Sequence, residues 1–359
     1  MAFLFRTYPT PGGWLACGVT GRKGDQVSAV EVKQLEKIYS VKHKQPGLLG
    51  SLRALWRPEY SSLTAVDRIS FELAAGEAVG FVGPNGAGKS TTIKMLAGIL
   101  YPSAGEARVL GLVPWRERQR LAFQIASVFG QRSQLWYHLP AADSFGLLAR
   151  IYELDDRAYR SRVATLIERF EIAPYLHVPV RRLSLGERMR CEIAAALLHR
   201  PRVVFLDEPT IGLDIVAKQQ IRALIRTLNQ EEGVTFLLTS HDAADIEQVC
   251  KRVIVINQGT LVFDGDVDEL KKRYLRHKVI DLKLSESAEP IAGPGLFLQH
   301  AEPYRIRYEV DTDVLPIERI IGQLVSLYRV SDLTVEEPPL EDVIAAIYAA
   351  TGHPSAIES

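Results

Sequence analysis

The sequence predicts an α/β fold with a mostly parallel sheet, an inserted helical subdomain and a small C-terminal α+β domain. Short apolar strands alternate with helical segments through much of the 359-residue chain, which is typical of βαβ units. Residues 140–200 have helical periodicity without strands, which indicates helices inserted between strand-bearing parts. From residue 279 onward, apolar and polar residues alternate as in a sheet with one solvent-facing side.

The individual elements divide the chain into three parts. Strands are expected at residues 28–41 and 66–82. Strand and helix pairs are expected at residues 78–82 with 89–97, 203–206 with 216–228, and 236–239 with 243–249. A further strand at 304–310 precedes amphipathic helices at 317–328 and 340–348. We therefore expect a tail at 1–27, a main domain at 28–278 with its helical subdomain at about 132–200, and an accessory domain at 279–359.

Composition excludes several classes of protein. Hydrophobic residues make up 47% and charged residues 24% of the chain, as in ordinary globular domains. Lys and Arg balance Asp and Glu at 43 each, so no overall basic field points to nucleic acid. The widely spaced Cys17, Cys191 and Cys250 suit neither a zinc site nor a disulfide framework, which favours a reducing cytoplasm. No apolar run approaches the ~20 residues of a membrane span, and residues 1–26 lack the apolar core of a signal peptide.

A glycine-rich segment at residues 83–91 matches G-x-x-x-x-G-K-[ST] between an expected strand and helix. Backbone N–H groups of such a loop point at phosphate oxygens, and the helix N-terminus adds partial positive charge. The alternative is a turn that only links the two elements. In the first interpretation Lys89 reaches the β- and γ-phosphates and Ser90 ligates Mg²⁺. The expected nucleotide-binding residues are Gly83, Pro84, Asn85, Gly86, Ala87, Gly88, Lys89, Ser90 and Thr91.

Two carboxylates, Asp207 and Glu208, end the apolar strand at 203–206. Ligands of open α/β sheets lie beyond the carboxyl ends of strands, so these side chains are expected in the same crevice as residues 83–91. Asp207 suits Mg²⁺, and Glu208 suits polarisation of an attacking water. Carboxylates at such a place are often only turn or helix-cap residues. The nearby phosphate loop favours the catalytic interpretation.

Three further positions carry weaker signals. Ser184 and Glu187 have the spacing of a capping box, and a capped helix N-terminus next to Gly186 is also an anion site. His241 follows the strand at 236–239 and could contact a γ-phosphate from the same sheet edge. Gln131 follows the apolar run at 126–129 and is weaker still.

Taken together, these motifs resemble the nucleotide-binding subunit of an ABC transporter over about residues 28–275. Residues 83–91 resemble its Walker A, Gln131 its Q-loop, LSLGE its signature, VVFLDEP its Walker B, residues 212–214 its D-loop and His241 its switch histidine. The resemblance implies ATP hydrolysis with Glu208 as the base, assisted by Lys89, Gln131 and His241. It also implies Mg²⁺ held by Ser90, Gln131 and Asp207, and nucleotide contacts from Tyr39 and Asp214. In the implied head-to-tail dimer, Ser184 and Gly186 of one subunit close over the ATP of the other.

The sequence departs from the family pattern in two places. Leu185 and Glu187 stand where the commonest signature has Gly and Gln, although Ser184 and Gly186 remain. Tyr39, the best match for the aromatic that stacks on adenine, is separated from the phosphate loop by an insertion-like stretch at 42–62. Leucines and Trp56 at helical spacing, with flanking basic residues, predict a short amphipathic helix in that stretch. It either packs on the strands or lies along a membrane partner or leaflet.

Residues 65–100 and the C-terminal extension resemble most the ABC-2 export branch, which includes drug and viologen exporters. That resemblance implies an integral membrane permease as partner, a second nucleotide-binding subunit, and a peripheral position on the cytoplasmic face of the inner membrane. The alternative is an ABC ATPase of translation or DNA repair, which usually carries two cassettes, a coiled coil or zinc cysteines. A P-loop GTPase or kinase would lack LSLGE and would not need His241.

Overall fold

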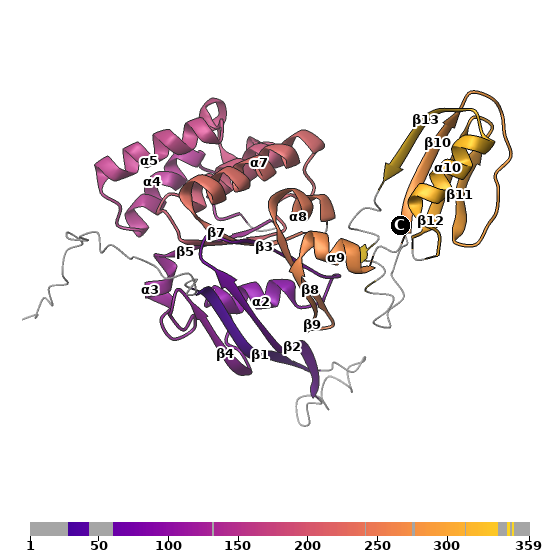
Figure 1. Ribbon diagram of the computed structural model, residues 1–359. Coiled ribbons are helices and arrows are strands. Elements are labelled where there is room, and N and C mark those ends of the chain that lie inside the picture. Colours follow the sequence, from indigo (N-terminus) through magenta and orange to yellow (C-terminus); the bar gives the residue numbers. More distant parts are fainter. Residues whose placement is uncertain are drawn as a thin grey trace, which may run out of the picture.

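The computed structural model describes residues 28–42, 60–130, 133–240, 242–274, 277–312, 314–336, 343, 344 and 347. Its strands form three sheets, with orders β2-β1-β4, β5-β6-β7-β3-β8-β9 and β11-β12-β10-β13 (Figure 1). The first two sheets and their helices form the cassette, and the third forms a separate C-terminal sheet (Figure 1).

The central sheet of the cassette is mostly parallel, which confirms the predicted fold class. Its parallel strands are β5 (Ile125–Phe129), β6 (Val203–Asp207), β7 (Thr235–Thr239), β3 (Ala78–Val82) and β8 (Arg252–Asn257). The edge strand β9 (Thr260–Asp266) runs antiparallel to β8. These strands are almost wholly apolar because both faces are covered: Val204 and Leu206 belong to one core cluster, and Val203 and Phe205 to the other.

Helices cover one face of this sheet and a mixed layer covers the other (Figure 1). The first layer contains α4 (Ala141–Ile151), α5 (Asp156–Arg169), α6 (Leu185–Ala196), α7 (Ile215–Glu232) and α8 (Ala243–Val249). The second layer contains α2 (Lys89–Leu96), α3 (Arg118–Ala122) and the antiparallel strands β1 (Ser28–Lys42), β2 (Tyr60–Ala74) and β4 (Ala104–Val109). Short 3-10 helices at Ala173–Tyr175 and Val180–Arg182 precede α6.

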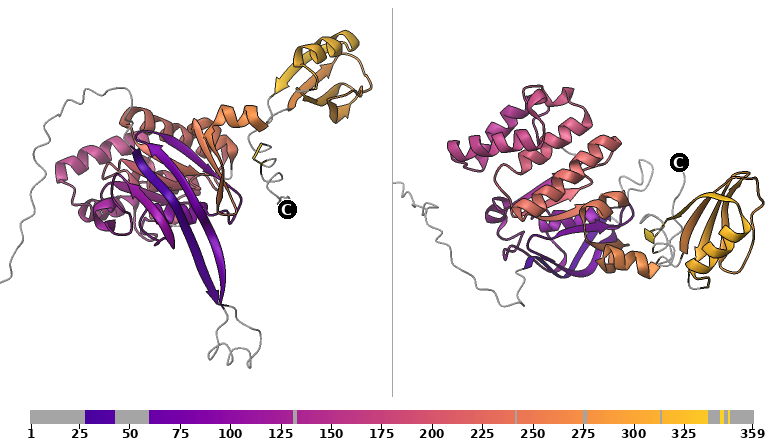
Figure 2. Two further views of the ribbon diagram at one scale, coloured as in Figure 1. Left: turned by 60° about the horizontal axis from the view of Figure 1, so that its bottom comes forward. Right: turned by 45° about the horizontal axis from the view of Figure 1, so that its top comes forward.

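The long strands β1 and β2 extend beyond the rest of their sheet (Figure 2). Pairing of β1 with β4 ends at Glu36, whereas its ladder with β2 continues to Lys42 opposite Tyr60. The expected strand boundaries on either side of the stretch at 42–62 are therefore wrong: β1 ends at Lys42 and β2 begins at Tyr60, not at residue 66. Lys42 and residues 60–62 are strand because the backbone pairing between β1 and β2 continues to this point. The expected amphipathic helix itself, with Trp56, lies outside the described residues.

The C-terminal sheet has a core of its own. Its strands are β10 (His277–Leu284), β11 (Leu296–Glu302), β12 (Arg305–Asp311) and β13 (Val330–Glu336), with α10 (Ile317–Leu327) packed on one face. Ion pairs cross the other face, where Arg305 meets Asp281 at 2.6 Å and Lys283 meets Asp332 at 2.8 Å. The predicted strand at 304–310 and helix at 317–328 agree with β12 and α10 within one residue. The division of the whole chain into three parts stays a prediction.

The chain enters and leaves the C-terminal sheet next to the cassette. Helix α9 (Val267–Tyr274) precedes β10, and its Val267 and Leu270 are buried in the helix-side core of the cassette. Val343, Ile344 and Ile347 are helical and belong to that same core cluster. None of the helices in the described ranges is long and apolar enough to cross a membrane.

Candidate functional site

The phosphate loop joins β3 to α2 and depends on glycines for its path. Gly88 has a φ of 107°, a conformation that side chains other than glycine rarely adopt. A Cβ on Gly88 would lie 2.4 Å from the carbonyl oxygen of Ala65, and one on Gly83 would lie 2.4 Å from that of Ile256. The loop therefore wraps tightly between β2 and β8 at the carboxyl end of β3, as its sequence predicts.

Lys89, the first residue of α2, points back into this loop. Its Nζ donates to the carbonyl oxygens of Gly83 at 2.6 Å and Pro84 at 3.1 Å, and the residue is 5% exposed. Burial lowers the pKa of the Lys89 ammonium, while the carboxylates of Glu208 and Asp207 oppose that shift. A buried ammonium held by neutral carbonyl groups is well placed to bind an anionic phosphate.

Asp207 and Glu208 lie at the carboxyl end of β6, and Thr239 at the end of β7 connects them. The Thr239 hydroxyl donates to Asp207 Oδ1 at 2.7 Å. The backbone N–H of Glu208 donates to the Thr239 carbonyl and hydroxyl oxygens, each at 3.1 Å. Glu208 also has a φ of 56°, and backbone conformations of this kind cluster at active sites. The structure thus fixes both predicted carboxylates at one edge of the sheet.

Gly130 brings the end of β5 to the same edge. Its N–H donates to the Asp207 carbonyl oxygen at 2.8 Å, and a Cβ on Gly130 would lie 2.2 Å from the Glu208 carbonyl oxygen. Only glycine permits such an approach of two backbones. The segment that leads to the predicted Gln131 therefore starts beside the two carboxylates. Gln131 and the predicted His241 themselves lie outside the described residues.

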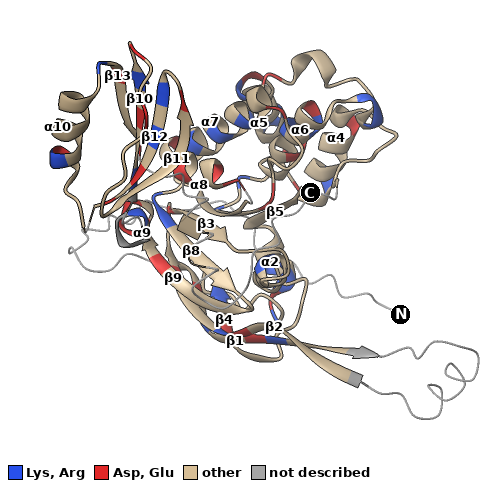
Figure 3. Cartoon of the chain, turned by 90° about the vertical axis from the view of Figure 1, so that its right-hand side faces the viewer, with Lys and Arg blue, Asp and Glu red and all other residues tan. Residues whose placement is uncertain are grey.

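The predicted signature residues open α6 on the helical side of the sheet, whereas α2 lies on the other side (Figure 3). The predicted capping box is confirmed: Ser184 Oγ accepts from the Glu187 N–H at 3.3 Å, and the Glu187 carboxylate accepts from the Ser184 N–H at 2.8 Å. A Cβ on Gly186 would lie 2.9 Å from Ala217 Cβ in α7. Asp214 caps α7 by accepting from the Ala217 N–H at 2.8 Å, so the signature and Asp214 lie together.

Tyr39 lies on β1 opposite Leu63 of β2, with Lys37 Nζ 5.3 Å from its ring centroid. Leu63 is two residues before Ala65, whose carbonyl oxygen faces Gly88. The ladder between β1 and β2 therefore brings Tyr39 to the side of the phosphate loop despite their separation in sequence.

The donor groups of this site fit a magnesium ion that is shared with a nucleotide. Within the described residues there is no cluster of three or more His, Cys, Asp and Glu side chains that could hold a metal ion. Mg²⁺ usually keeps several waters and binds through one or two carboxylates together with substrate phosphates. Asp207 and the Ser90 hydroxyl at the start of α2 are donors of that type.

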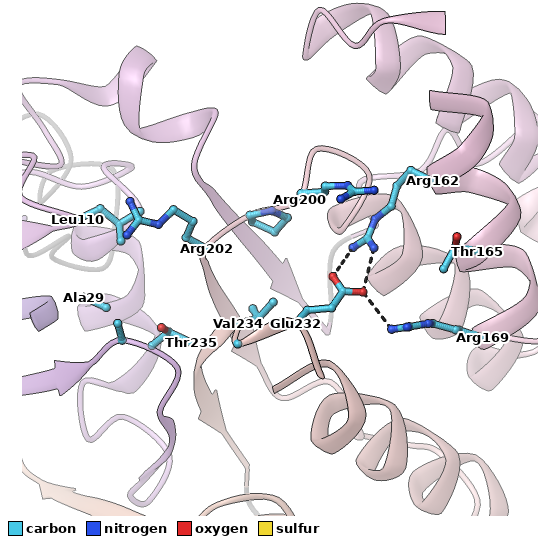
Figure 4. A pocket seen from close by; sticks show the side chains of 13 residues that line it. Ala29, Leu110, Arg162, Thr165, Arg169, Arg200, Arg202, Glu232, Val234 and Thr235 are labelled. Carbon is cyan, nitrogen blue, oxygen red and sulfur yellow. Dashed lines mark hydrogen bonds and ion pairs between the residues drawn. The ribbon is translucent and has the colours of Figure 1, made fainter. Parts of the chain in front are cut away.

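A cavity of about 590 Å³ lies at the opposite end of the sheet, where β6 and β7 begin (Figure 4). Glu232 accepts from Arg162 through both carboxylate oxygens at 2.9 Å, and Arg169 also donates to it at 2.9 Å. Helices α5 and α7 end at Arg169 and Glu232, and helix C-termini favour nearby cations. These contacts account for Glu232, Arg162 and Arg169 in the lining of the cavity without a nucleotide.

The sequence analysis did not predict several residues of the site. Gly130 acts through its backbone, and Thr239 acts through its hydroxyl and its carbonyl oxygen. No motif distinguishes either residue. Asp245 is buried in α8 and binds side chains from two loops and from α7. Its place four residues after His241 in the sequence is the signal that could have indicated it.

Comparison with known proteins agrees with this geometry. The family described as ABC transporter matches residues 66–211. A linearmycin resistance ATP-binding protein of Bacillus subtilis, LnrL, is 30% identical over 79% of this chain and 93% of its own length. The chain belongs to the ABC transporter family. A daunorubicin/doxorubicin resistance ATP-binding protein of Streptomyces peucetius, DrrA, is 31% identical over 82% of this chain and 90% of its own length.

A solved ABC cassette has the same fold. The ATP-binding cassette MJ0796, determined as a dimer bound to ADP and Pi, gives a TM-score of 0.56 at 23% identity, over 66% of this chain and 98% of that one. This ABC transporter ATPase therefore binds and hydrolyses ATP, as the family does.

Gly88→Ala is expected to weaken ATP binding about tenfold, because the left-handed backbone and the contact with Ala65 would force the loop to move. Isothermal titration calorimetry with ATP measures the effect. Gly111→Ala is the matched control, since Gly111 has a φ of 78° and no atom near its Cβ position. Equal losses of ATP affinity in the two variants would contradict this account of the loop.

Proposed function

We propose that this chain is the ATP-hydrolysing subunit of an ABC-2-type exporter, which works with a separate integral membrane permease at the cytoplasmic face of the inner membrane. The names of the relatives support export, since LnrL and DrrA are resistance proteins. The names of these two relatives do not support the alternative, an ABC ATPase that takes no part in transport.

The main structural support for this proposal is a groove lined by Ser133 and Gln134, which follow Gln131 in the sequence. It has a volume of about 360 Å³ and lies between β5, the end of α2, α3, α4 and α6. Apolar side chains flank it: Phe123 is 46% exposed with its ring 6.0 Å from that of the groove residue Tyr152, and Ile151 is 53% exposed. Its lining includes Ile99, Val128, Ser133, Gln134, Tyr152 and Glu192. An apolar helix of a permease fits such a groove.

The same groove adjoins the hydrolytic site. Ser133 and Gln134 line it only two and three residues beyond Gln131, and the Glu192 carboxylate on α6 accepts from both of them. A permease segment in the groove would therefore press on the chain that leads to Gln131 and on the helix that begins at Ser184. Movement of either one changes the groups around ATP, which couples hydrolysis to transport.

In the proposed mechanism each residue has one task. The loop at residues 83–91 and Lys89 bind the phosphates, and Tyr39 packs on the adenine. Ser90, Asp207 and Gln131 would hold Mg²⁺, which would neutralise charge on the phosphates. Glu208 accepts a proton from the attacking water, and His241 contacts the γ-phosphate from the neighbouring strand end.

We also propose a head-to-tail dimer. Ser184, Gly186 and Asp214 lie together on the helical side of the sheet, whereas Lys89 and Ser90 begin α2 on the other side (Figure 3). A second copy that turns its α6 toward this phosphate loop would complete the cradle with a helix N-terminus. Each ATP would then be held by two subunits.

Affinity purification in mild detergent is expected to recover an integral membrane protein with the wild-type chain. Phe123→Asp together with Ile151→Asp should reduce that recovery to about a tenth or less, because two charges would enter an apolar contact. The matched control is Phe297→Asp on the C-terminal sheet, where the side chain is 53% exposed. Recovery of no membrane protein with the wild type would contradict the export proposal, and full recovery with the double variant would contradict the groove.

Mixing two inactive variants tests the dimer. Ser184→Arg blocks the signature contact and Lys89→Ala removes the phosphate contact, so each homodimer should be inactive. A mixed dimer keeps one site in which Lys89 and Ser184 are both native, and ATPase activity should reappear on mixing. Mixed dimers that form and yet stay inactive at every ratio would count against head-to-tail sharing.

Glu208→Gln is expected to lower turnover by about 10²–10⁴-fold and to leave ATP affinity unchanged, since Glu208 acts on the water and not on the nucleotide. Phosphate release and calorimetry measure the two quantities on the same preparation. Wild-type turnover in this variant would show that Glu208 is not the base that accepts the proton of the attacking water.

A further inference from the structure

A buried carboxylate lies behind the catalytic edge of the sheet. Asp245, on α8, is 0% exposed and accepts hydrogen bonds from the hydroxyls of Thr210 and Ser240. Thr210 comes two residues after Glu208, and Ser240 directly precedes His241. One carboxylate therefore holds the two loops that follow β6 and β7, next to both proposed catalytic groups.

The loops held by Asp245 surround a small cavity. It measures about 220 Å³ and is lined by Glu208, Thr210, Ser240 and Asp242, among others. The N–H of Asp242 donates to Ser240 Oγ at 3.0 Å. Glu208 and the two residues whose hydroxyls bind Asp245 therefore line the same cavity.

Helix α7 supplies the charge that balances Asp245. Arg222 Nε donates to Asp245 Oδ1 at 2.6 Å, and its NH2 group reaches Asp242 at 3.1 Å. Lys218, one turn earlier, meets Asp242 at 2.6 Å. Asp214 caps the same helix, so the network links the carboxyl ends of β6 and β7 to the helix that follows the predicted D-loop residue.

Such a network costs free energy to bury, and apolar residues of similar volume often stabilise a protein equally well. What apolar residues cannot supply is a fixed mutual position of several hydrogen-bonded loops. Here the loops are those next to Glu208 and His241, which must be aligned on one water and one phosphate. A misplacement of about 1 Å in such a site can cost on the order of 10²-fold in rate.

We infer that Asp245 is a positioning residue for ATP hydrolysis, which holds the loops of Glu208 and His241 in register through the hydroxyls of Thr210 and Ser240. The inference rests on the proposed roles of Glu208 and His241. Asp245 makes no contact with the phosphate loop through these bonds, so it sets kcat and leaves ATP affinity unchanged.

Removal of the hydroxyls tests this without leaving a buried charge unpaired, because Asp245 keeps Arg222. Thr210→Val and Ser240→Ala should each lower kcat about 10- to 100-fold, with unchanged KM and unchanged ATP affinity. Thr210→Ser and Ser240→Thr keep a hydroxyl and should retain most of the wild-type kcat. If Thr210→Val does not fold, Thr210→Ala removes the same bond without added bulk.

Thr235→Val is the matched control, since Thr235 lies at the other end of β7 and its buried hydroxyl accepts from the Gly76 N–H at 2.8 Å. It should lower Tm as much as Ser240→Ala and leave kcat unchanged. In a Glu208→Gln background, Thr210→Val should lower the residual turnover no further, because the group that it positions is already disabled.

Two results would overturn the inference: wild-type kcat in Thr210→Val and Ser240→Ala, or a loss of kcat in Thr235→Val equal to theirs. Failure of the proposed catalytic role is a separate outcome, seen when Glu208→Gln alone keeps wild-type turnover.

Discussion

The contact between the ends of β6 and β7 is the interaction on which the rest of the site depends. Thr239 donates its hydroxyl proton to Asp207 and accepts the N–H of Glu208 through two oxygens. The bonds are available because both strands are buried on two faces and cannot slide, so their last residues meet at a constant register. Lys89, the Gly130 segment and the loops tied to Asp245 are all arranged around this pair of strand ends.

The phosphate loop and the signature belong to different core layers. The phosphate loop belongs to the layer of β1, β2 and α2, whereas the signature belongs to the layer of α4 and α6. The central sheet separates the two layers, and residues of both line the groove proposed for the permease. In that proposal, a movement of the helical layer would change the surroundings of ATP without a change in the loop that binds its phosphates.

Sequence patterns predicted the parts of the fold that depend on local chemistry. The period of the apolar residues indicated the buried strands, and the spacing of Gly88, Lys89 and Ser90 indicated the phosphate loop. The capping box of Ser184 and Glu187 was likewise predicted from the sequence, because the two residues are three positions apart. By contrast, the extension of β1 and β2 depends on cross-strand pairing, and two partners of Asp245, Thr210 and Arg222, are 35 and 23 residues away in the sequence. Contacts between segments far apart leave no pattern in a single sequence.

The return of the chain to the cassette determines how the C-terminal sheet can move. The chain leaves the cassette at Leu270 and comes back at Val343, Ile344 and Ile347, so the sheet is attached at two points on one core. Two attachments restrict the positions of the sheet relative to the cassette more than a single attachment would. A cut near residue 340 would leave the sheet joined to the cassette through α9 alone, so this one break would remove half of its anchorage.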